Sequence, residues 1–272
     1  MDVGEVRIAD DRDFEQLKRL ADKQDDWKVE YSKRQTTVWT RPTEQTPFKM
    51  IKLDTTYKDL PAGLLFDVMM DPGYRKKWDV YMLESYDIGC LNPNNDIGYY
   101  AVRSPPPLRN RDFVLQRSWL ETKKEIMVLN HSVFYESVPP RKGFVRATSY
   151  LTGFVIRPST DGRGCHFTYV TQCDPKGTLP AWFVNKLTQI FAPKMAKRIG
   201  VACQGYTTWK AKNNQNLKPW LYPEQAMLPR VDLARCCPPS HVQEEPDLDE
   251  SSVAEDSFNG STDFIELDDA QK

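Results

Sequence analysis

The stretch that decides the fold lies late in the chain, at residues 180–210, and reads PAWFVNKLTQIFAPKMAKRIGVACQGYTTWK. Its apolar side chains recur at helical spacing from Phe183 to Tyr206 and form one stripe along a helix. Pro193 lies inside this pattern and predicts a kink or a break, because proline has no amide hydrogen to donate to the preceding turn. We therefore predict a long C-terminal helix with one face buried.

The residues before this helix predict a sheet. Apolar and β-branched segments bounded by turn residues indicate strands at 27–33, 36–41, 48–54, 81–89, 97–104, 111–121, 126–134, 143–157 and 165–174. Helical spacing indicates two further helices, over 11–23 and 60–70. The expected fold class is α+β, with a curved antiparallel sheet of about nine strands wrapped around the long helix. Such a sheet leaves a cavity against the helix, and we expect the function to lie there.

The composition narrows the class of protein. The chain has 272 residues, of which 40% are hydrophobic, enough for a sizeable core. Its apolar runs are far shorter than the ~20 residues needed to span a bilayer, and its first residues lack a secretory signal. Six cysteines without CxxC spacing and three scattered histidines predict neither a disulfide framework nor a metal site. We expect a cytoplasmic monomer without metal or cofactor.

The net charge of −1 hides a strong asymmetry. Residues 241–272 hold eleven acidic residues and one lysine, which leaves 36 basic and 27 acidic residues in 1–240, a net charge of +9. A basic body suits an anionic partner, either a membrane surface or a nucleic acid. Since no motif of a nucleic-acid-binding module is present, we expect no nucleic-acid partner and a transient association with anionic membranes.

The same asymmetry suggests the organisation of the chain. We predict an N-terminal extension with the start of the first helix at 1–19, a globular domain at 20–212, and an acidic C-terminal extension at 213–272, disordered from about 236. Ser252 has Glu255 three residues downstream, a pattern suited to an acidophilic kinase of the casein kinase II type. Phosphate there would add about −1.5 to −2 charge. The tail either regulates membrane binding or only aids solubility.

Arg75 and Asp79 are the candidate binding residues. They bracket the segment YRKKWD at 74–79, and their i,i+4 spacing places both side chains on one face of a helical turn. An arginine oriented by a carboxylate can still offer donors to a phosphate. Taken alone, such a pair is more often a surface ion pair worth less than ~1 kcal/mol.

Four motifs favour the binding interpretation. They are YRKKWD at 74–79, NRDF at 110–113, GFVR at 143–146 and DPKGTLPAW at 174–182. With these motifs in this order, residues 20–212 resemble the START-domain family, most closely the phosphatidylcholine-transfer subgroup and its member with an acidic C-terminal tail. The resemblance implies a helix-grip fold that encloses one lipid molecule.

The resemblance also implies residue roles. Arg75 would contact the lipid phosphate and Asp79 would brace the arginine. Three aromatic residues would surround choline, and Thr152 would lie near the head group; the aromatic residues are Tyr100, Phe113 and Tyr150. Because Tyr100 replaces a tryptophan and Phe113 a tyrosine of the family pattern, we expect weaker choline selection, and so phosphatidylcholine together with phosphatidylethanolamine. Without the resemblance, ordinary packing in the sheet core would explain these aromatic residues.

The final helix and the loop at 104–110 are the expected gate of the cavity. Four residues are candidates for contact with acyl chains or the membrane interface: Pro106, Leu108, Phe183 and Phe191. Four basic residues are expected to draw the helix toward anionic lipid: Lys186, Lys194, Lys197 and Arg198. The helix could also be a core helix with a solvated basic face.

The predicted function is a cytoplasmic phospholipid carrier that moves single molecules between membranes. The alternatives are a START domain that binds sterol or ceramide, and a lipid sensor or adaptor. We expect no enzymatic activity, since the sequence contains no G-x-S-x-G elbow and no readable pairing of a histidine with a nucleophile.

Overall fold

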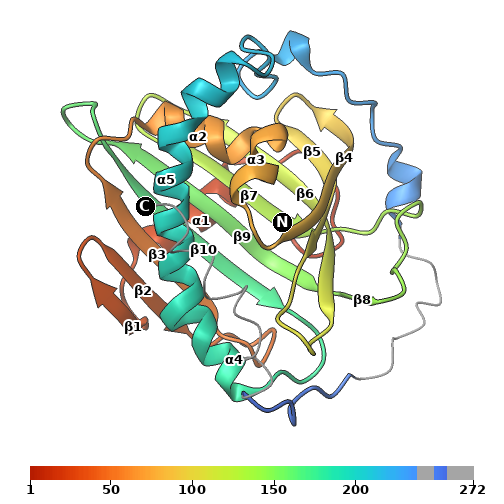
Figure 1. Ribbon diagram of the computed structural model, residues 1–272. Coiled ribbons are helices and arrows are strands. Elements are labelled where there is room, and N and C mark those ends of the chain that lie inside the picture. Colours follow the sequence, from red (N-terminus) through yellow and green to blue (C-terminus); the bar gives the residue numbers. More distant parts are fainter. Residues whose placement is uncertain (238–247, 256–272) are drawn as a thin grey trace.

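A computed structural model describes residues 1–237 and 248–255. Its centre is one curved, mainly antiparallel sheet in the order β1-β2-β3-β10-β9-β7-β6-β5-β4, with the short β8 paired in parallel to β6 (Figure 1). The strands are β1 Lys28–Lys33, β2 Thr36–Arg41, β3 Met50–Tyr57, β4 Met82–Asn92, β5 Asn95–Val102, β6 Asn110–Glu121, β7 Ile126–Ser132, β8 Phe144–Arg146, β9 Thr148–Pro158 and β10 Cys165–Asp174. The predicted α+β class is confirmed.

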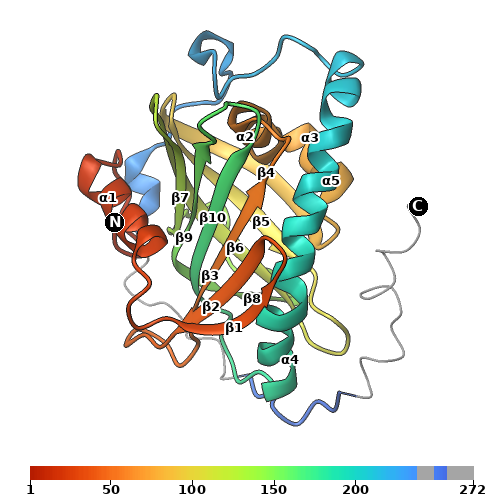
Figure 2. The same ribbon diagram turned by 90° about the vertical axis from the view of Figure 1, so that its left-hand side faces the viewer.

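Helices cover both faces of this sheet. The long helix α5 lies along the inner face, beside α2 and α3, whereas α1 packs against the outer face (Figure 2). The helices are α1 Asp11–Asp22, α2 Ala62–Met70, α3 Pro72–Trp78, α4 Ala181–Lys186 and α5 Ala192–Ala211, with short 3-10 turns at Pro223–Gln225 and Leu233–Cys236. Phe14 and Leu17 of α1 are buried in the outer core, while Ile199 and Tyr206 of α5 are buried in the inner one.

The predicted break in the C-terminal helix is confirmed. Between α4 and α5 the chain forms a π-helical turn, Leu187–Phe191, and Pro193 lies in the first turn of α5. Proline has no amide hydrogen and clashes with the carbonyl four residues earlier, so a regular helix cannot run through it. π-Helical turns of this kind are frequent at functional sites.

The predicted strand at 143–157 is wrong as one element. It is two strands, because β8 pairs in parallel with β6 and β9 pairs with β7 and β10. Arg146 at the end of β8 forms an ion pair with the buried Asp112, with Nε 2.9 Å from Oδ1, and holds this short strand against β6. The contact joins distant residues, and strand periodicity does not reveal it.

Asp71 fixes the start of α3 against α5. One of its carboxylate oxygens accepts hydrogen bonds from two backbone amides in the first turn of α3, as an N-cap does. The other accepts from the Tyr206 hydroxyl at 3.0 Å and from the Lys210 ammonium at 2.7 Å. All three side chains are buried. This link sets the position of Arg75, one turn further along α3.

The C-terminal extension packs along the domain as far as residue 237. Trp220 is buried and its Nε1 donates to Asp67 at 2.8 Å. Cys90 of the edge strand β4 exchanges backbone hydrogen bonds with Pro229 and Val231, so the extension covers this sheet edge. Residues 248–255 also pack on the domain, although the low hydropathy of the tail had suggested otherwise. Among the described residues, no helix is long and apolar enough to cross a bilayer.

Candidate functional site

A cavity of about 740 Å³ lies between the inner face of the sheet and the α4–α5 region. This volume is typical of small-molecule sites, which range over about 300–1,000 Å³. Alternate residues of β6 line it, including Phe113, Leu115 and Arg117. Most of the lining is apolar, so the charged side chains within it are the candidate binding groups.

Arg75 and Asp79 both line this cavity. Arg75 Nη2 donates to the Met69 carbonyl at the end of α2 at 2.6 Å, and its guanidinium lies over the Trp78 ring at 5.4 Å. Its Nη1 is 3.6 Å from Asp79 Oδ2, beyond an ordinary hydrogen bond. The arginine side chain is 26% exposed and the aspartate 12%. A guanidinium has five N–H donors, so this arrangement orients Arg75 and leaves donors available to an anion.

Tyr100 connects this pair to the sheet. Its hydroxyl donates to Asp79 Oδ2 at 2.9 Å. Burial, and after it the Asp79 charge, raise the pKa of Tyr100 well above 10, so the phenol stays protonated and acts as a donor. Phe113 lies directly opposite Tyr100 in the β5–β6 ladder, and both residues line the cavity, as does Thr152.

Tyr150, by contrast, does not line the cavity, and its predicted place in the aromatic group is wrong. It is the extra residue of a β-bulge, because Leu151 pairs with Gln172 whereas Ser149 pairs with Cys173. A bulge turns its residue out of the strand alternation. The Tyr150 hydroxyl instead donates to the Gln45 carbonyl at 3.2 Å.

Tyr169 is an aromatic residue that the sequence reasoning missed. It lines the cavity from β10 together with Phe167 and Thr171. Burial, followed by the nearby Cys173, raises the pKa of Tyr169, and the charges of Arg75 and Asp79 also act on it. Period-two alternation in β10 is the signal that could have identified Tyr169.

A second charged pair in the cavity wall was also missed. Arg117 Nε donates to Asp96 Oδ1 at 3.0 Å, and its Nη2 is 3.6 Å from Asp87. Burial raises the pKa of Asp96 despite the attraction of Arg117. Both residues come from neighbouring strands, where they are cross-strand partners. Arg117 and Phe113 are four positions apart in β6, so their side chains point to the same face of the sheet. This spacing is the sequence signal for the inward position of Arg117.

The predicted apolar gate residues divide into two groups. Phe183 and Phe191 line the cavity, with ring centroids 6.1 Å apart. Pro106 is exposed, whereas Leu108 is buried at 5% exposure. Neither is part of the cavity lining, and the loop contributes Ser104 and Pro105 instead. Leu108 is therefore not placed for the predicted contact with acyl chains, because its buried side chain is not part of the cavity wall.

The four basic residues differ in their exposure to solvent. Lys197 is exposed, while Lys186, Lys194 and Arg198 are half-buried. The Arg198 guanidinium lies 5.2 Å from the Tyr81 ring centroid and its terminal nitrogens are buried, so in this conformation Arg198 does not present its donors at the surface, and its expected part in drawing the helix toward anionic lipid stays a prediction. Lys186 lies 2.9 Å from Glu255 of the tail.

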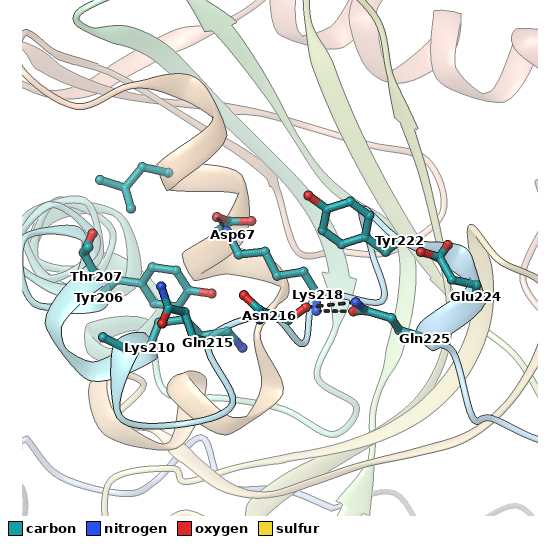
Figure 3. A pocket seen from close by; sticks show the side chains of 12 residues that line it. Asp67, Tyr206, Thr207, Lys210, Gln215, Asn216, Lys218, Tyr222, Glu224 and Gln225 are labelled. Atoms are coloured by element: carbon teal, nitrogen blue, oxygen red, sulfur yellow. Dashed lines mark hydrogen bonds and ion pairs between the residues drawn. The ribbon is translucent and has the colours of Figure 1, made fainter.

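A second pocket, of about 620 Å³, lies at the C-terminal end of α5 beneath the extension (Figure 3). Three of its charged groups have partners, since Asp67 binds Lys218 at 2.6 Å and Lys210 binds Asp71 at 2.7 Å. The backbone amide of Lys218 also donates to Gln225. No trio of metal-binding side chains occurs within residues 1–237 and 248–255. The central cavity is therefore the stronger candidate site.

A curved sheet that closes on a C-terminal helix over an apolar cavity defines a lipid-binding protein of the helix-grip class. The START-domain model matches residues 7–210, and the chain belongs to this family of lipid transfer proteins. The match begins before residue 20, so it includes α1, which the predicted boundary had divided.

Individual relatives agree with this assignment. Mouse START domain-containing protein 10 is 41% identical over 251 residues, which cover 92% of this chain and 86% of that protein. Bovine phosphatidylcholine transfer protein is 30% identical over 185 residues, 66% of this chain and 85% of that one. The crystal structure of human STARD10 matches with a TM-score of 0.79 and 42% identity, over 85% of this chain and 94% of that chain. The resemblance seen in the sequence, including its phosphatidylcholine-transfer subgroup, is confirmed.

Proposed function

We propose that this START domain is a cytoplasmic carrier that transfers single phosphatidylcholine and phosphatidylethanolamine molecules between membranes. The observation that carries the proposal is Arg75, held in the wall of an apolar cavity with hydrogen-bond donors to spare. The similarity to bovine phosphatidylcholine transfer protein supports the choice of lipid. In this proposal the domain binds and releases its ligand without chemical change and acts as a monomer.

The energetics of a free phospholipid explain the need for a carrier. A diacyl lipid exposes on the order of 30 methylenes, each costing about 0.8 kcal/mol in water, so escape from a membrane costs some 20 kcal/mol or more. An apolar cavity removes most of this cost. A phosphate buried without a counter-ion would be prohibitive. Arg75 supplies that counter-ion, and Asp79 balances the arginine when the cavity is empty.

Tyr169 takes the place of Tyr150 in the proposed aromatic site for the head-group cation, together with Tyr100 and Phe113. A cation–π contact contributes about 0.5–2 kcal/mol, so Tyr169→Leu is expected to weaken phosphatidylcholine binding by about three- to thirtyfold. Tyr150→Leu is the matched control and should leave binding unchanged. Equilibrium binding of a fluorescent phosphatidylcholine measures both variants. A larger loss for Tyr150→Leu than for Tyr169→Leu would contradict the assignment.

Native mass spectrometry of the purified chain, followed by lipid extraction, tests the proposed function directly. The expected result is one bound lipid per monomer, mostly phosphatidylcholine and phosphatidylethanolamine. Detection of sterol or ceramide in their place would overturn the proposal. One observation favours a sterol or ceramide ligand: the Arg117–Asp96 pair lines the same cavity and could bind a single hydroxyl group.

Loading requires the cavity to open at a membrane. The α4 segment and its π-helical turn, with Phe183 and Phe191 on the cavity wall, are the proposed gate. The net positive body and the exposed Lys197 would favour a transient contact with anionic lipid.

The acidic tail is the proposed site of regulation. Ser252 is exposed, and an acidophilic kinase of the casein kinase II type would recognise it through Glu255. Added negative charge on the tail would lower the affinity for anionic membranes and slow transfer. Equal transfer rates before and after stoichiometric phosphorylation of Ser252 would exclude this step.

A further inference from the structure

The tail residues Leu248–Glu255 contact the domain through a buried carboxylate. Glu250 is 7% exposed, and its two oxygens bind Arg109, in the loop before β6, and Arg111, in β6 itself. Oε1 accepts from the Arg109 amide at 2.7 Å, and Oε2 accepts from Arg111 Nη2, also at 2.7 Å. The Arg111 side chain is 5% exposed, so this is a desolvated ion pair. Breaking such a pair removes the counter-ion of a buried charge, although the Arg111 guanidinium also donates to the backbone carbonyls of Arg109, Pro175 and Lys176.

Backbone contacts set the path of the same segment. The Thr178 amide donates to the Leu248 carbonyl at 2.8 Å, and the Glu250 amide donates to the Thr178 carbonyl at 2.9 Å. The chains approach closely beside Gly177, where an added Cβ would lie 2.3 Å from the Leu248 carbonyl oxygen. Gly177 also has a φ of +69°, a conformation that glycine adopts without strain. The loop that contains Gly177 therefore leaves room for the extended tail segment to pack against its backbone.

The other end of the segment binds α4. Trp182 Nε1 donates to the Val253 carbonyl at 2.7 Å, and Lys186 pairs with Glu255 at 2.9 Å. In Figure 1 the segment, in dark blue, runs past the lower end of α4. It therefore joins α4 to the start of β6 and the loop before it, and α4 and β6 both contribute to the cavity lining.

We propose that Leu248–Glu255 is an intramolecular latch that holds the cavity closed at its α4 end. The proposal rests on the carrier function. None of the residues of α4 is buried, and its N-terminus has no side-chain cap. A π-helical turn and Pro193 follow it, so the regular α-helical hydrogen-bond pattern is interrupted between α4 and α5. The latch adds a hydrogen bond at Trp182 and an ion pair at Lys186 to the contacts that hold α4, and lipid exchange requires their release.

The charges of the latch suggest which partner competes with the tail for binding to the domain. The acidic segment neutralises Arg111 and Lys186, two cations that would otherwise attract a phosphate-rich surface. An anionic membrane therefore competes with the tail for the same cations and promotes opening where lipid is to be collected.

The test compares Glu250→Gln with Asp249→Asn in the full chain. Both substitutions remove one negative charge, but the Asp249 carboxylate binds the amide of Ser251 within the tail rather than the domain. Vesicle-to-vesicle transfer of a fluorescent phosphatidylcholine is measured with purely zwitterionic vesicles, so that electrostatic attraction to the membrane is removed. Glu250→Gln is expected to accelerate transfer about tenfold, because weakening a closed state raises the open population in proportion. Asp249→Asn should match the unaltered chain.

Hydrogen exchange tests the latch independently of transfer. The amides of Thr178 and Glu250 are expected to be protected in the unaltered chain and in Asp249→Asn, and to exchange at least about tenfold faster in Glu250→Gln. Unprotected amides in the unaltered chain would overturn the latch even if transfer is normal. Equal acceleration by both substitutions would also overturn it, since charge alone would then explain the tail. Protected amides in a chain that transfers no phospholipid would instead refute the carrier function.

Discussion

Replacement of Arg75 by methionine is expected to abolish phospholipid pickup and to lower the transfer rate by at least about 100-fold. Methionine keeps much of the apolar bulk of arginine but leaves a buried lipid phosphate without its counter-ion. Removing one partner of a buried charge pair costs about 3–5 kcal/mol, and about 1.4 kcal/mol corresponds to a factor of ten. Transfer between labelled vesicles measures the rate, and extraction of bound lipid measures occupancy. Near-normal transfer by this variant would contradict the proposed role of Arg75.

Three further variants separate binding from folding. Lys77→Met changes a neighbouring exposed cation on α3 and should leave transfer intact. Arg75→Lys keeps the charge but loses the planar fork, so a smaller loss of about tenfold is expected. Arg75→Met also removes the cation beside Asp79, which is 12% exposed. The double variant Arg75→Met, Asp79→Asn removes that unpaired charge, and it should regain thermal stability without regaining lipid.

The part of the site that the sequence predicted correctly is local. Arg75 and Asp79 lie on one helical turn, so their spacing alone brings them together. The break before α5 is equally local, because the missing amide of Pro193 acts within its own helix. Such features depend on neighbours in the chain and need no knowledge of the tertiary structure.

The features that were missed depend on how distant strands pair. By strand alternation alone, Tyr150 would point to the same face as Thr152. The β-bulge that turns Tyr150 away forms only where β9 pairs with β10. The Arg117–Asp96 pair likewise forms only when β5 and β6 are in register. The tail is a third case, since its acidic composition predicted disorder, while Glu250 is ordered by Arg111, 139 residues away in the chain.

Asp71→Asn is expected to cause the largest loss of stability, about 3–5 kcal/mol, because it leaves the buried Lys210 ammonium without a counter-ion. For a domain of this size such a loss lowers Tm by about 10 °C. Asp161→Asn is the matched control, since it changes an exposed turn aspartate that also accepts a backbone hydrogen bond, and it should leave Tm nearly unchanged. Thermal unfolding followed by circular dichroism measures both variants.

The double variant Asp71→Asn, Lys210→Met shows whether the unpaired charge causes this loss. Methionine removes the buried ammonium and keeps most of the apolar volume, so the double variant should recover a large part of the lost stability. If Asp71→Asn is no less stable than Asp161→Asn, the carboxylate is not what joins α3 to α5. If Asp71→Asn is unstable but the double variant is stable, lipid pickup is measured at a temperature below the Tm of both variants. This measurement tests whether Arg75 is still correctly positioned. Because the same carboxylate caps α3, lipid pickup should then remain weaker than in the unaltered chain even where folding is restored.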